Sequence, residues 1–297
     1  MISIIIPVYQ AEKTIGMVLK ALLSQDIKKD YEVICVDDES KDNSCNIIKK
    51  YPVKLIKLKK NQGPAVARNQ GAKKAKGKLI CFLDADCVPE PNWLRKITEG
   101  MKSTKVNKIG IIYGSISFHS NFLGDVDNFS HFWAQHPKLP PGIRNGFTSS
   151  NICVNKKVFE EAGGFDPTLR LGEDFDLSYR LMLKGYSNFF LPEANIHHFH
   201  DRTTLNPIIK RAFKMGKNGG MNRVKYRDYF SRLFPRNPYV LLLLSVPFAF
   251  LTTCKIIFKC FKYKKNVFLC APFIFLAKMS WIFGAFEGIK KYQNTKK

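Results

Sequence analysis

Two carboxylates, Asp84 and Asp86, stand one residue apart directly after an apolar run at residues 79–83. An apolar run bounded by turn residues predicts a buried strand. Because side chains alternate along an extended chain, both carboxylates should lie on one side and face one hard cation, such as Mg²⁺ or Mn²⁺, that carries a diphosphate. Ligands of open α/β sheets bind beyond the carboxyl ends of the strands, where this pair falls. For an isolated pair, a solvated acidic turn is the alternative.

Polar and aromatic residues also follow two other predicted strands. Pro7 and Tyr9 end the first strand, and Asp38 follows the second. A tyrosine ring can stack on a base, and a carboxylate can accept a hydrogen bond from the base's ring N–H. Arg68, on a predicted helix, could bring positive charge to the phosphates. The pattern predicts a nucleotide site; the alternatives are a packing role for Tyr9 and a solvated helix position for Arg68.

A third acidic group, at Asp174, begins another predicted helix. Carboxylates in a first helical turn are favoured by the helix dipole, so a structural role is open. The functional alternative is a general base that takes the proton from an attacking hydroxyl. Asp176 and Arg180, four residues apart, should pair with each other. His198 or His200 could complete the metal shell or contact phosphate, and a structural role is equally open for each.

The elements that must position these residues alternate between strand and helix. Strands are predicted at residues 3–9, 31–36, 53–58 and 78–83, and helices near 15–23, 40–48, 65–75 and 93–97, the second capped by Ser40. Short crossovers of this kind predict an α/β fold with a mainly parallel central sheet and helices on both faces. The lysine-rich third strand should lie at an edge.

The second half of this region is less regular. A strand at residues 109–117 is followed by residues 118–146, which lack clear periodicity and are rich in aromatic and histidine residues. Long irregular segments in compact domains are often functional, so acceptor binding and simple aromatic packing both remain open. A strand at 148–154 and a helix at 156–162 follow.

The positive charge of the chain is concentrated in its last third. The 297 residues carry a formal net charge of +24, of which residues 201–297 contribute 20 basic and 3 acidic residues. Two apolar runs, at 239–258 and 267–286, favour an anionic membrane over nucleic acid as the partner. Lysines interrupt the runs and fill the loop between them, which conflicts with the positive-inside rule. Two spanning helices, a re-entrant or in-plane pair, and a buried soluble hairpin therefore all remain open.

The eight cysteines indicate a reducing compartment. Several lie inside apolar runs, and none has the C-x-x-C spacing of a structural zinc site. The first residues form a predicted strand and lack the features of a signal peptide. We therefore expect the first domain to lie in the cytoplasm.

Six motifs occur in the order and approximate spacing of family 2 glycosyltransferases, which the chain resembles over about residues 1–200. They are SIIIPVY at 3–9, VDDES at 36–40, NQGPAVARN at 61–69, FLDAD at 82–86, GGFD at 163–166 and GED at 172–174. The resemblance implies a GT-A fold, a nucleotide-diphospho-sugar donor, a divalent metal and inversion at the anomeric carbon. One departure is Glu39, where the family commonly has glycine, and we expect it to change only the turn after the second strand.

The resemblance also implies roles for single residues. Asp38 would contact the base, Asp86 would bind the metal, and Asp84 would lie near the diphosphate or the sugar. The position of His198, and not the resemblance, makes it the second expected metal ligand. Asp174 would be the catalytic base. The remaining expected donor-binding residues are Pro7, Tyr9, Gly63 and Arg68.

These observations predict a glycosyltransferase domain at 1–205, a basic juxtamembrane linker at 206–238 and two apolar helices at 239–290. Processive members carry a Q-x-x-R-W motif after the base, which residues 210–216 lack, so we expect addition of one sugar. The expected acceptor is a lipid-linked glycan or glycolipid in cell-envelope or exopolysaccharide synthesis, with the catalytic domain on the cytoplasmic side of the cell membrane. The alternatives are transfer to a polyprenyl phosphate and, without catalysis, a membrane-anchored nucleotide-binding module.

Overall fold

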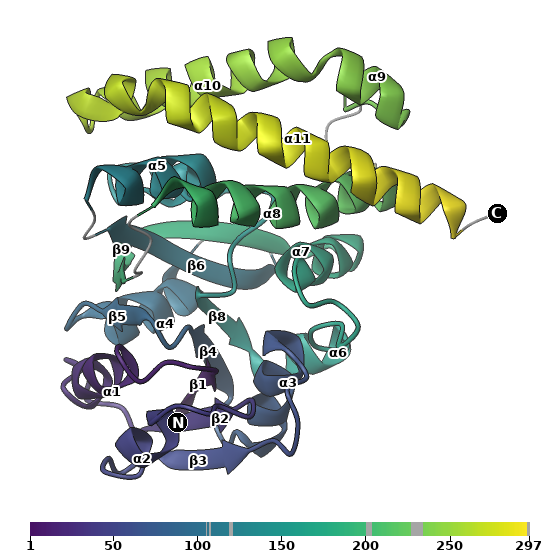
Figure 1. The fold of residues 1–297 in the computed structure, drawn as a ribbon. Coiled ribbons are helices and arrows are strands. Elements are labelled where there is room, and N and C mark those ends of the chain that lie inside the picture. The colour runs from purple at the N-terminus through teal and green to yellow at the C-terminus, as the bar shows by residue number, and fades with distance from the viewer. Residues whose placement is uncertain (105, 107, 119–120, 200–203, 227–233, 296–297) are drawn as a thin grey trace. The chain divides into compact units, whose positions relative to one another are not determined.

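The computed structural model describes the chain except for residues 105, 107, 119–120, 200–203, 227–233 and 296–297 (Figure 1). It contains two compact units. The sheet unit comprises residues 1–117 and 135–199, and the helical unit comprises residues 118–134 and 200–297. Each is described separately below.

The sheet unit is built on strands in the order β3-β2-β1-β4-β8-β6-β9-β5, with β7 paired to β9. The strands are β1 (Ile2–Val8), β2 (Tyr31–Asp37), β3 (Lys54–Lys57), β4 (Leu79–Leu83), β5 (Cys87–Pro89), β6 (Ile109–Phe118), β7 (Gly142–Ile143), β8 (Asn151–Asn155) and β9 (Ser187–His198). The helices are α1 (Ile15–Leu23), α2 (Ser44–Ile48), α3 (Pro64–Lys74), α4 (Trp93–Ser103), α6 (Lys156–Glu161) and α7 (Glu173–Leu183).

The expected α/β fold is confirmed, and its parallel part is the first half of the sheet. Strand β1 pairs in parallel with β2 and β4, and β2 pairs in parallel with β3, which lies at the edge as expected. In the second half, β8 is antiparallel to β4 and β6, and β5 and β7 are antiparallel to β9. The carboxyl ends of β1, β2 and β4 therefore meet along one rim, because these strands run in the same direction.

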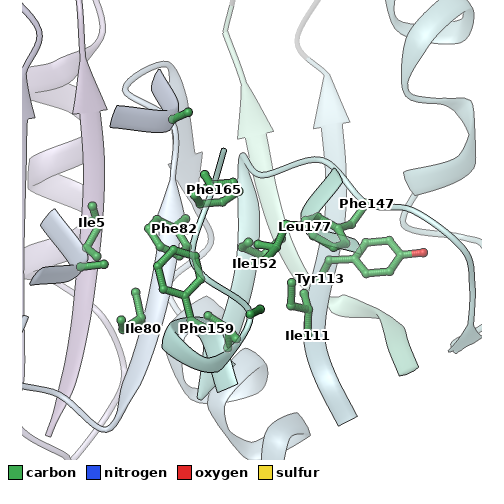
Figure 2. Packing of buried hydrophobic residues seen from close by; sticks show 14 of the residues in the cluster. Ile5, Ile80, Phe82, Ile111, Tyr113, Phe147, Ile152, Phe159, Phe165 and Leu177 are labelled. Atoms are coloured by element: carbon green, nitrogen blue, oxygen red, sulfur yellow. The ribbon is translucent and has the colours of Figure 1, made fainter. Parts of the chain in front are cut away.

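Both faces of the sheet are covered. On one face, Ile5 and Phe82 belong to a cluster that includes residues of α3, α6 and α7 (Figure 2). The ring of Phe82 lies 5.2 Å from the rings of both Phe159 and Phe165, measured between centroids. Ile4 and Ile6 point to the opposite face and are also fully buried, as the strand's lack of polar alternation predicts.

Two local predictions were wrong. Helix α2 begins at Ser44 with Asn43 as its N-cap, whereas the Ser40 hydroxyl accepts a hydrogen bond from the Gln10 N–H. The helix starts later than predicted because Asp42, two residues after Ser40, accepts a hydrogen bond from the Ser44 N–H at the first helical position. The segment 118–146 is also more regular than expected, because it contains α5 (Phe122–His131) and a short 3₁₀ helix at Trp133–Gln135.

The helical unit consists of α5 and the C-terminal helices. These are α8 (Leu205–Lys225), α9 (Pro238–Leu243), α10 (Ser245–Phe261), the 3₁₀ helix η2 (Lys265–Cys270) and α11 (Ala271–Asn294). The range 206–238, expected as a linker, thus contains most of α8. The first apolar run is divided between α9 and α10. Within the described residues, one helix, Lys265–Asn294, is long and apolar enough to span a membrane, whereas two spanning helices were one of the alternatives left open by the sequence.

Glycines bring the backbones of α8 and α11 into contact. A Cβ atom on Gly216 would lie 1.9 Å from the Trp281 carbonyl oxygen, and one on Gly284 would lie 2.0 Å from the Phe213 carbonyl oxygen. Only glycine fits at such distances. Small residues spaced by four allow helices to approach this closely, and Gly216 and Gly220 lie against Trp281 and Ala285 of α11.

Candidate active site

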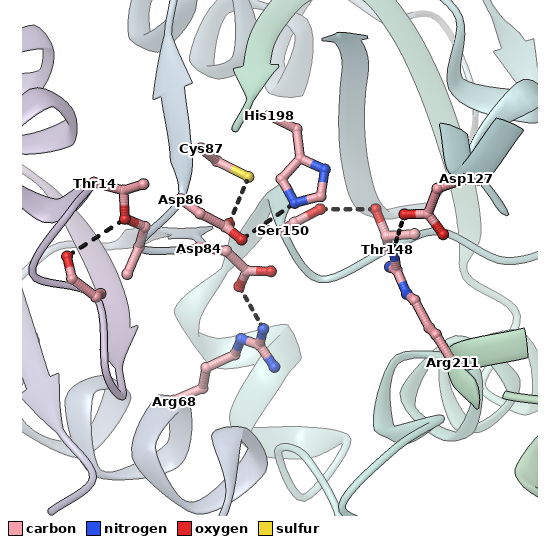
Figure 3. Close-up of polar contacts among 12 residues, drawn as sticks. Thr14, Arg68, Asp84, Asp86, Cys87, Asp127, Thr148, Ser150, His198 and Arg211 are labelled. Atoms are coloured by element: carbon pink, nitrogen blue, oxygen red, sulfur yellow. Dashed lines mark hydrogen bonds and ion pairs between the residues drawn. The ribbon is translucent and has the colours of Figure 1, made fainter. Parts of the chain in front are cut away.

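The turn after β4 presents the two carboxylates that the sequence singled out. The Thr14 hydroxyl donates to the Ala85 carbonyl over 2.8 Å, which fixes the residue between them (Figure 3). The Phe199 N–H donates to the Asp86 carbonyl over 2.9 Å, so the end of β9 is joined to the same turn. Both carboxylate side chains keep about a third of their surface exposed, 33% for Asp84 and 38% for Asp86. They are held in place yet accessible to a ligand.

Asp86 and His198 form a candidate metal centre. The Nε2 atom of His198 lies 3.2 Å from an oxygen of Asp86, so both atoms could bind one divalent cation (Figure 3). The Cys87 thiol lies beside them. Burial raises the pKa of Cys87 well above its usual value, which keeps the thiol protonated and makes it a weak ligand. A carboxylate oxygen suits both Mn²⁺ and Mg²⁺, and an imidazole nitrogen is more compatible with Mn²⁺, so the residues fit one of the two expected metals.

Arg68 forms a buried bridge between two elements that are distant in the sequence. Its guanidinium donates to the Asp84 carboxylate over 2.6 Å and to the Glu173 carboxylate over 2.9 Å. Only 4% of its side chain is exposed, and the group also lies over the Phe165 ring. The bridge joins the turn after β4 to the first turn of α7. Arg68 is therefore not a solvated helix residue.

Asp174 lies next to this bridge, in the first turn of α7. Its carboxylate accepts a hydrogen bond from the Phe175 N–H over 2.8 Å. Burial, and then the negative charge of Glu173, raise the pKa of Asp174 to about 7, although that N–H and the Arg68 charge act in the opposite direction. A carboxylate with a raised pKa is a better proton acceptor than an ordinary aspartate.

The expected base-binding residues meet at the ends of β1 and β2. The Asp38 N–H donates to the Val8 carbonyl over 2.8 Å. The Asp38 carboxylate accepts from the N–H groups of Gln62 and Gly63 over 2.8 and 2.7 Å. It thereby holds the turn in front of α3, where Gly63 has a left-handed φ of 92°. Pro7 lies within β1 and the Tyr9 side chain is 53% exposed, so its ring is open to a stacking partner.

Glu39 occupies a backbone position that favours glycine. Its φ of 69° is in the left-handed region, which is unfavourable for a residue with a Cβ atom. The side chain accepts a hydrogen bond from the Asn61 N–H over 3.0 Å, a contact that glycine could not make. The departure at this position therefore strains the turn after β2 and adds a link to the loop before α3.

Sequence reasoning missed two members of the site. Glu173 had been considered only as part of a helix start, yet it is buried and pairs with Arg68. The Ser149 hydroxyl donates to the same Glu173 oxygen over 3.3 Å, which ties the residues before β8 to α7. The row of hydroxyls at Thr148, Ser149 and Ser150 was a signal, because polar residues directly before a buried strand need partners.

The other predicted residues have structural partners. Asp176 and Arg180 pair over 2.7 Å, as their spacing predicted. His197 contacts Glu90 over 2.6 Å, on the other side of β9 from His198. His200, the alternative to His198, lies outside the described residues.

Sequence comparison places the first four of the six motifs in a known group. Residues 3–161 match the family model described as Glycosyl transferase family 2. Glycosyltransferase AglE of Haloferax volcanii is 29% identical over 223 residues, covering 73% of this chain and 72% of the relative. A second relative, from Methanococcus voltae, is 26% identical over 270 residues, and the match covers 82% of this chain and 80% of the relative. It is named dolichyl N-acetyl-alpha-D-glucosaminyl phosphate 3-beta-D-2,3-diacetamido-2,3-dideoxy-beta-D-glucuronosyltransferase.

A solved structure shares the fold over the whole chain. The mannosyltransferase PcManGT from Pyrobaculum calidifontis, determined in complex with GDP-Man and Mn²⁺, aligns with a TM-score of 0.63. The alignment covers 100% of this chain and 88% of PcManGT at 17% sequence identity. At that identity the likeness concerns the fold alone.

Proposed function

The chain belongs to glycosyltransferase family 2, and from that premise we propose that it is an inverting, metal-dependent enzyme. It transfers one sugar from a nucleotide-diphospho-sugar to a hydroxyl group of a lipid-linked glycan or glycolipid, in cell-envelope or exopolysaccharide synthesis. The name of the relative from Methanococcus voltae, which refers to a dolichyl-linked acceptor, supports the acceptor class. The lack of a Q-x-x-R-W motif supports single addition.

The donor would lie along the rim formed by the ends of β1, β2 and β4. The exposed ring of Tyr9 stacks on the base, and Asp38 holds the loop at Gly63 that lines the nucleotide. Asp86 and His198 would hold the divalent cation. When bound, such a cation neutralises the charge that develops on the departing diphosphate. That the fold neighbour PcManGT was determined with GDP-Man and Mn²⁺ supports both the donor class and the metal.

Asp174 acts as the base. Displacement from the face opposite the leaving group needs one proton acceptor for the attacking hydroxyl. The raised pKa of Asp174 makes it a stronger proton acceptor at neutral pH than an ordinary aspartate. Asp84 remains an acceptor for the Arg68 guanidinium and keeps the turn before Asp86 in register with α7.

The observation that carries the proposal is the Arg68 bridge. It ties the acidic turn after β4 to the helix start that bears Asp174, although these segments are about 90 residues apart in the chain. The bridge supports a single site in which Asp86 would hold the metal and Asp174 would accept the proton, as a direct displacement requires.

The cytoplasmic side is the proposed location of the catalytic domain. All eight cysteines are free thiols and seven of them are buried. This supports a reducing compartment, because disulfides form mainly outside the cytoplasm.

The test is Asp174→Asn, with Asp26→Asn as the control, because the Asp26 side chain is 68% exposed. We expect Asp174→Asn to bind GDP- or UDP-sugars with Mn²⁺ as the parent does, in a thermal-shift titration, and to lose about 100-fold or more in transfer to a hydroxyl acceptor. The control should retain both properties. Unchanged transfer by Asp174→Asn would contradict the base assignment, and retained transfer to a polyprenyl phosphate alone would favour that anionic acceptor.

A further inference from the structure

We propose that the helical unit binds an anionic bilayer in the plane of one leaflet, through a membrane face formed by α9, α10 and η2, and that α11 does not span the membrane. The proposal deepens the proposed function, because it specifies how an enzyme with a lipid-linked acceptor attaches to the membrane. It rests on where the helical unit exposes apolar side chains and where it exposes charge.

The membrane face is defined by the exposed, large apolar residues of α9, α10 and η2. Leu243 is 81% exposed and Phe258 is 85% exposed, which is unusual for such side chains in water. The other exposed members are Tyr239, Val240, Leu244, Val246, Phe250, Leu251, Phe261, Phe268 and Leu269. Exposed apolar patches of this extent mark interaction surfaces.

The opposite side of α10 packs within the helical unit. Its buried residues recur every three or four positions and are Ser245, Ala249, Thr253, Ile256 and Cys260. This spacing places them on one side of the helix, so the larger Phe250 and Phe258 face outward. Small and polar residues inside with large aromatic residues outside is the reverse of a soluble helix. A helix of this kind is suited to lie in a membrane interface.

Lysines at the end of this face indicate the charge of the partner. Lys259, Lys262 and Lys265 are exposed beside Phe258, Phe261 and Phe268. The Lys259 amine also lies 5.5 Å from the Trp133 ring centroid, and tryptophan and lysine are both common at the level of lipid headgroups. After Asp228 the sequence contains one acidic residue, Glu287. The surface is therefore complementary to anionic headgroups rather than to a second copy of this cationic chain.

Helix α11 is long enough to span a bilayer, but the helices packed against it argue against a spanning arrangement. It packs between α8 and the pair α9 and α10 (Figure 1). Backbone contact at Gly284 and Gly288 binds it to α8 along several turns. That helix carries charged residues throughout: Lys210, Arg211, Lys214, Lys217, Arg223 and Lys225. If α11 crossed the membrane, α8 would be drawn into the hydrocarbon with these charges, which is strongly unfavourable.

The in-plane arrangement also removes the conflict with the positive-inside rule. The lysines between α10 and α11 need not cross the membrane, because both helices stay on the side where the chain is made. These lysines would contact the headgroups of the leaflet into which Leu243 and Phe258 insert.

The first test is flotation of the full chain with vesicles, after dilution from detergent. We expect tight binding to vesicles of phosphatidylcholine with phosphatidylglycerol. The triple variant Leu243→Ser, Phe250→Ser and Phe258→Ser should bind at least about 100-fold more weakly. A control with Ile143→Ser and Leu183→Ser, which are 57% and 65% exposed on the sheet unit, should bind as the parent does. Equal loss in the control, or none in the triple variant, would overturn the proposed face.

The charge contribution is tested with Lys259→Gln, Lys262→Gln and Lys265→Gln together. Binding to the phosphatidylglycerol vesicles should weaken by about 100-fold, and binding to pure phosphatidylcholine should not change. If the three apolar substitutions instead convert a dimer to a monomer and leave vesicle binding intact, the face is an interface between two copies of this chain. The proposal would then be wrong. These assays need neither donor nor acceptor, so their failure is distinct from failure of the proposed transfer reaction.

Labelling decides between the in-plane and spanning arrangements. In a Cys254→Ser background, Lys265→Cys and Asn294→Cys place one thiol at each end of the long helix. With a membrane-impermeant maleimide added outside sealed vesicles, the in-plane arrangement predicts that both thiols react. Reaction at one end alone would show that the helix spans the bilayer. Retained donor binding in each variant controls for folding.

Discussion

The two units differ in where they place most of the charge that we assign to function. In the sheet unit, Arg68 is buried and bonded to two carboxylates, and His198 lies against Asp86. The helical unit also has a partly buried pair, Arg211 with Asp127 over 2.7 Å, but the lysines around Phe258 and Phe261 are exposed, and glycines bring the backbones of α8 and α11 together. Buried, paired charge fixes geometry and shifts pKa values, which chemistry requires. Exposed charge beside an apolar surface can attach the protein to a membrane, and such attachment depends little on any one residue.

The largest effect that would sharpen this comparison is expected from Arg68→Met. Removing one partner of a buried ion pair leaves uncompensated charge, here on Glu173, and costs about 3–5 kcal/mol. We expect about 3 kcal/mol in the free energy of unfolding by urea, because Asp84 is one-third exposed and partly rehydrates. The matched control is Arg95→Met, whose partner Asp26 is exposed, with a loss below about 1 kcal/mol. Similar losses in both variants would contradict the special role of the bridge.

The next largest effect concerns the helical unit. Gly284→Ala places a methyl group 2.0 Å from the Phe213 carbonyl oxygen, so α11 must move away from α8. We expect a loss of about 2 kcal/mol in unfolding free energy, since overpacking typically costs 1–3 kcal/mol. Gly16→Ala in α1 is the control, because its nearest neighbours lie at an ordinary 3.5 Å and no loss is expected. If Gly284→Ala is harmless, backbone contact does not hold this unit together.

The smallest effect is a shift in pH dependence. Transfer requires the ionised form of Asp174, whose pKa is raised to about 7, so the rate should fall about tenfold for each pH unit below 7. Glu173→Gln removes the like charge and lowers the pKa of Asp174, which should move the profile toward lower pH by roughly one unit. The rate of transfer measured from pH 5 to 9 gives the midpoint.

Asp176→Asn is the matched control for that shift. It changes an acid of the same helical turn, but its side chain pairs with Arg180 rather than facing Asp174. The variant should lose stability and keep the parent's pH midpoint. A shift equal to that of Glu173→Gln would mean that stability, and not the charge beside Asp174, controls the profile.

The first half of the sheet could be predicted from sequence because its signals are local. The apolar run at β1 and the acidic residues after β4 are adjacent in the chain, and crossover helices between strands require parallel pairing. The antiparallel second half could not be predicted, since the pairing of β8 with β4 joins segments about 70 residues apart. The start of α2 was misplaced because Ser40 and Asn43 are equally suitable caps by type.

The candidate site divides in the same way. The pairing of Asp176 with Arg180 follows from helical spacing and was predicted. The pairing of Arg68 with Glu173, 105 residues apart, was not, and Arg68 had a solvated position as an equal alternative. The sequence identified the residue types that the chemistry needs but not the contacts that hold them.

By itself, the sequence determined the strand and helix types at the rim, the family, and the acids able to bind a cation or accept a proton. Only the tertiary structure decided that Arg68 joins two of these acids and that α9, α10 and η2 expose more large apolar side chains than α11 does. The physical reason is distance along the chain. Periodicity and motif spacing report what neighbours do, whereas burial and ion pairing depend on segments that meet only after folding.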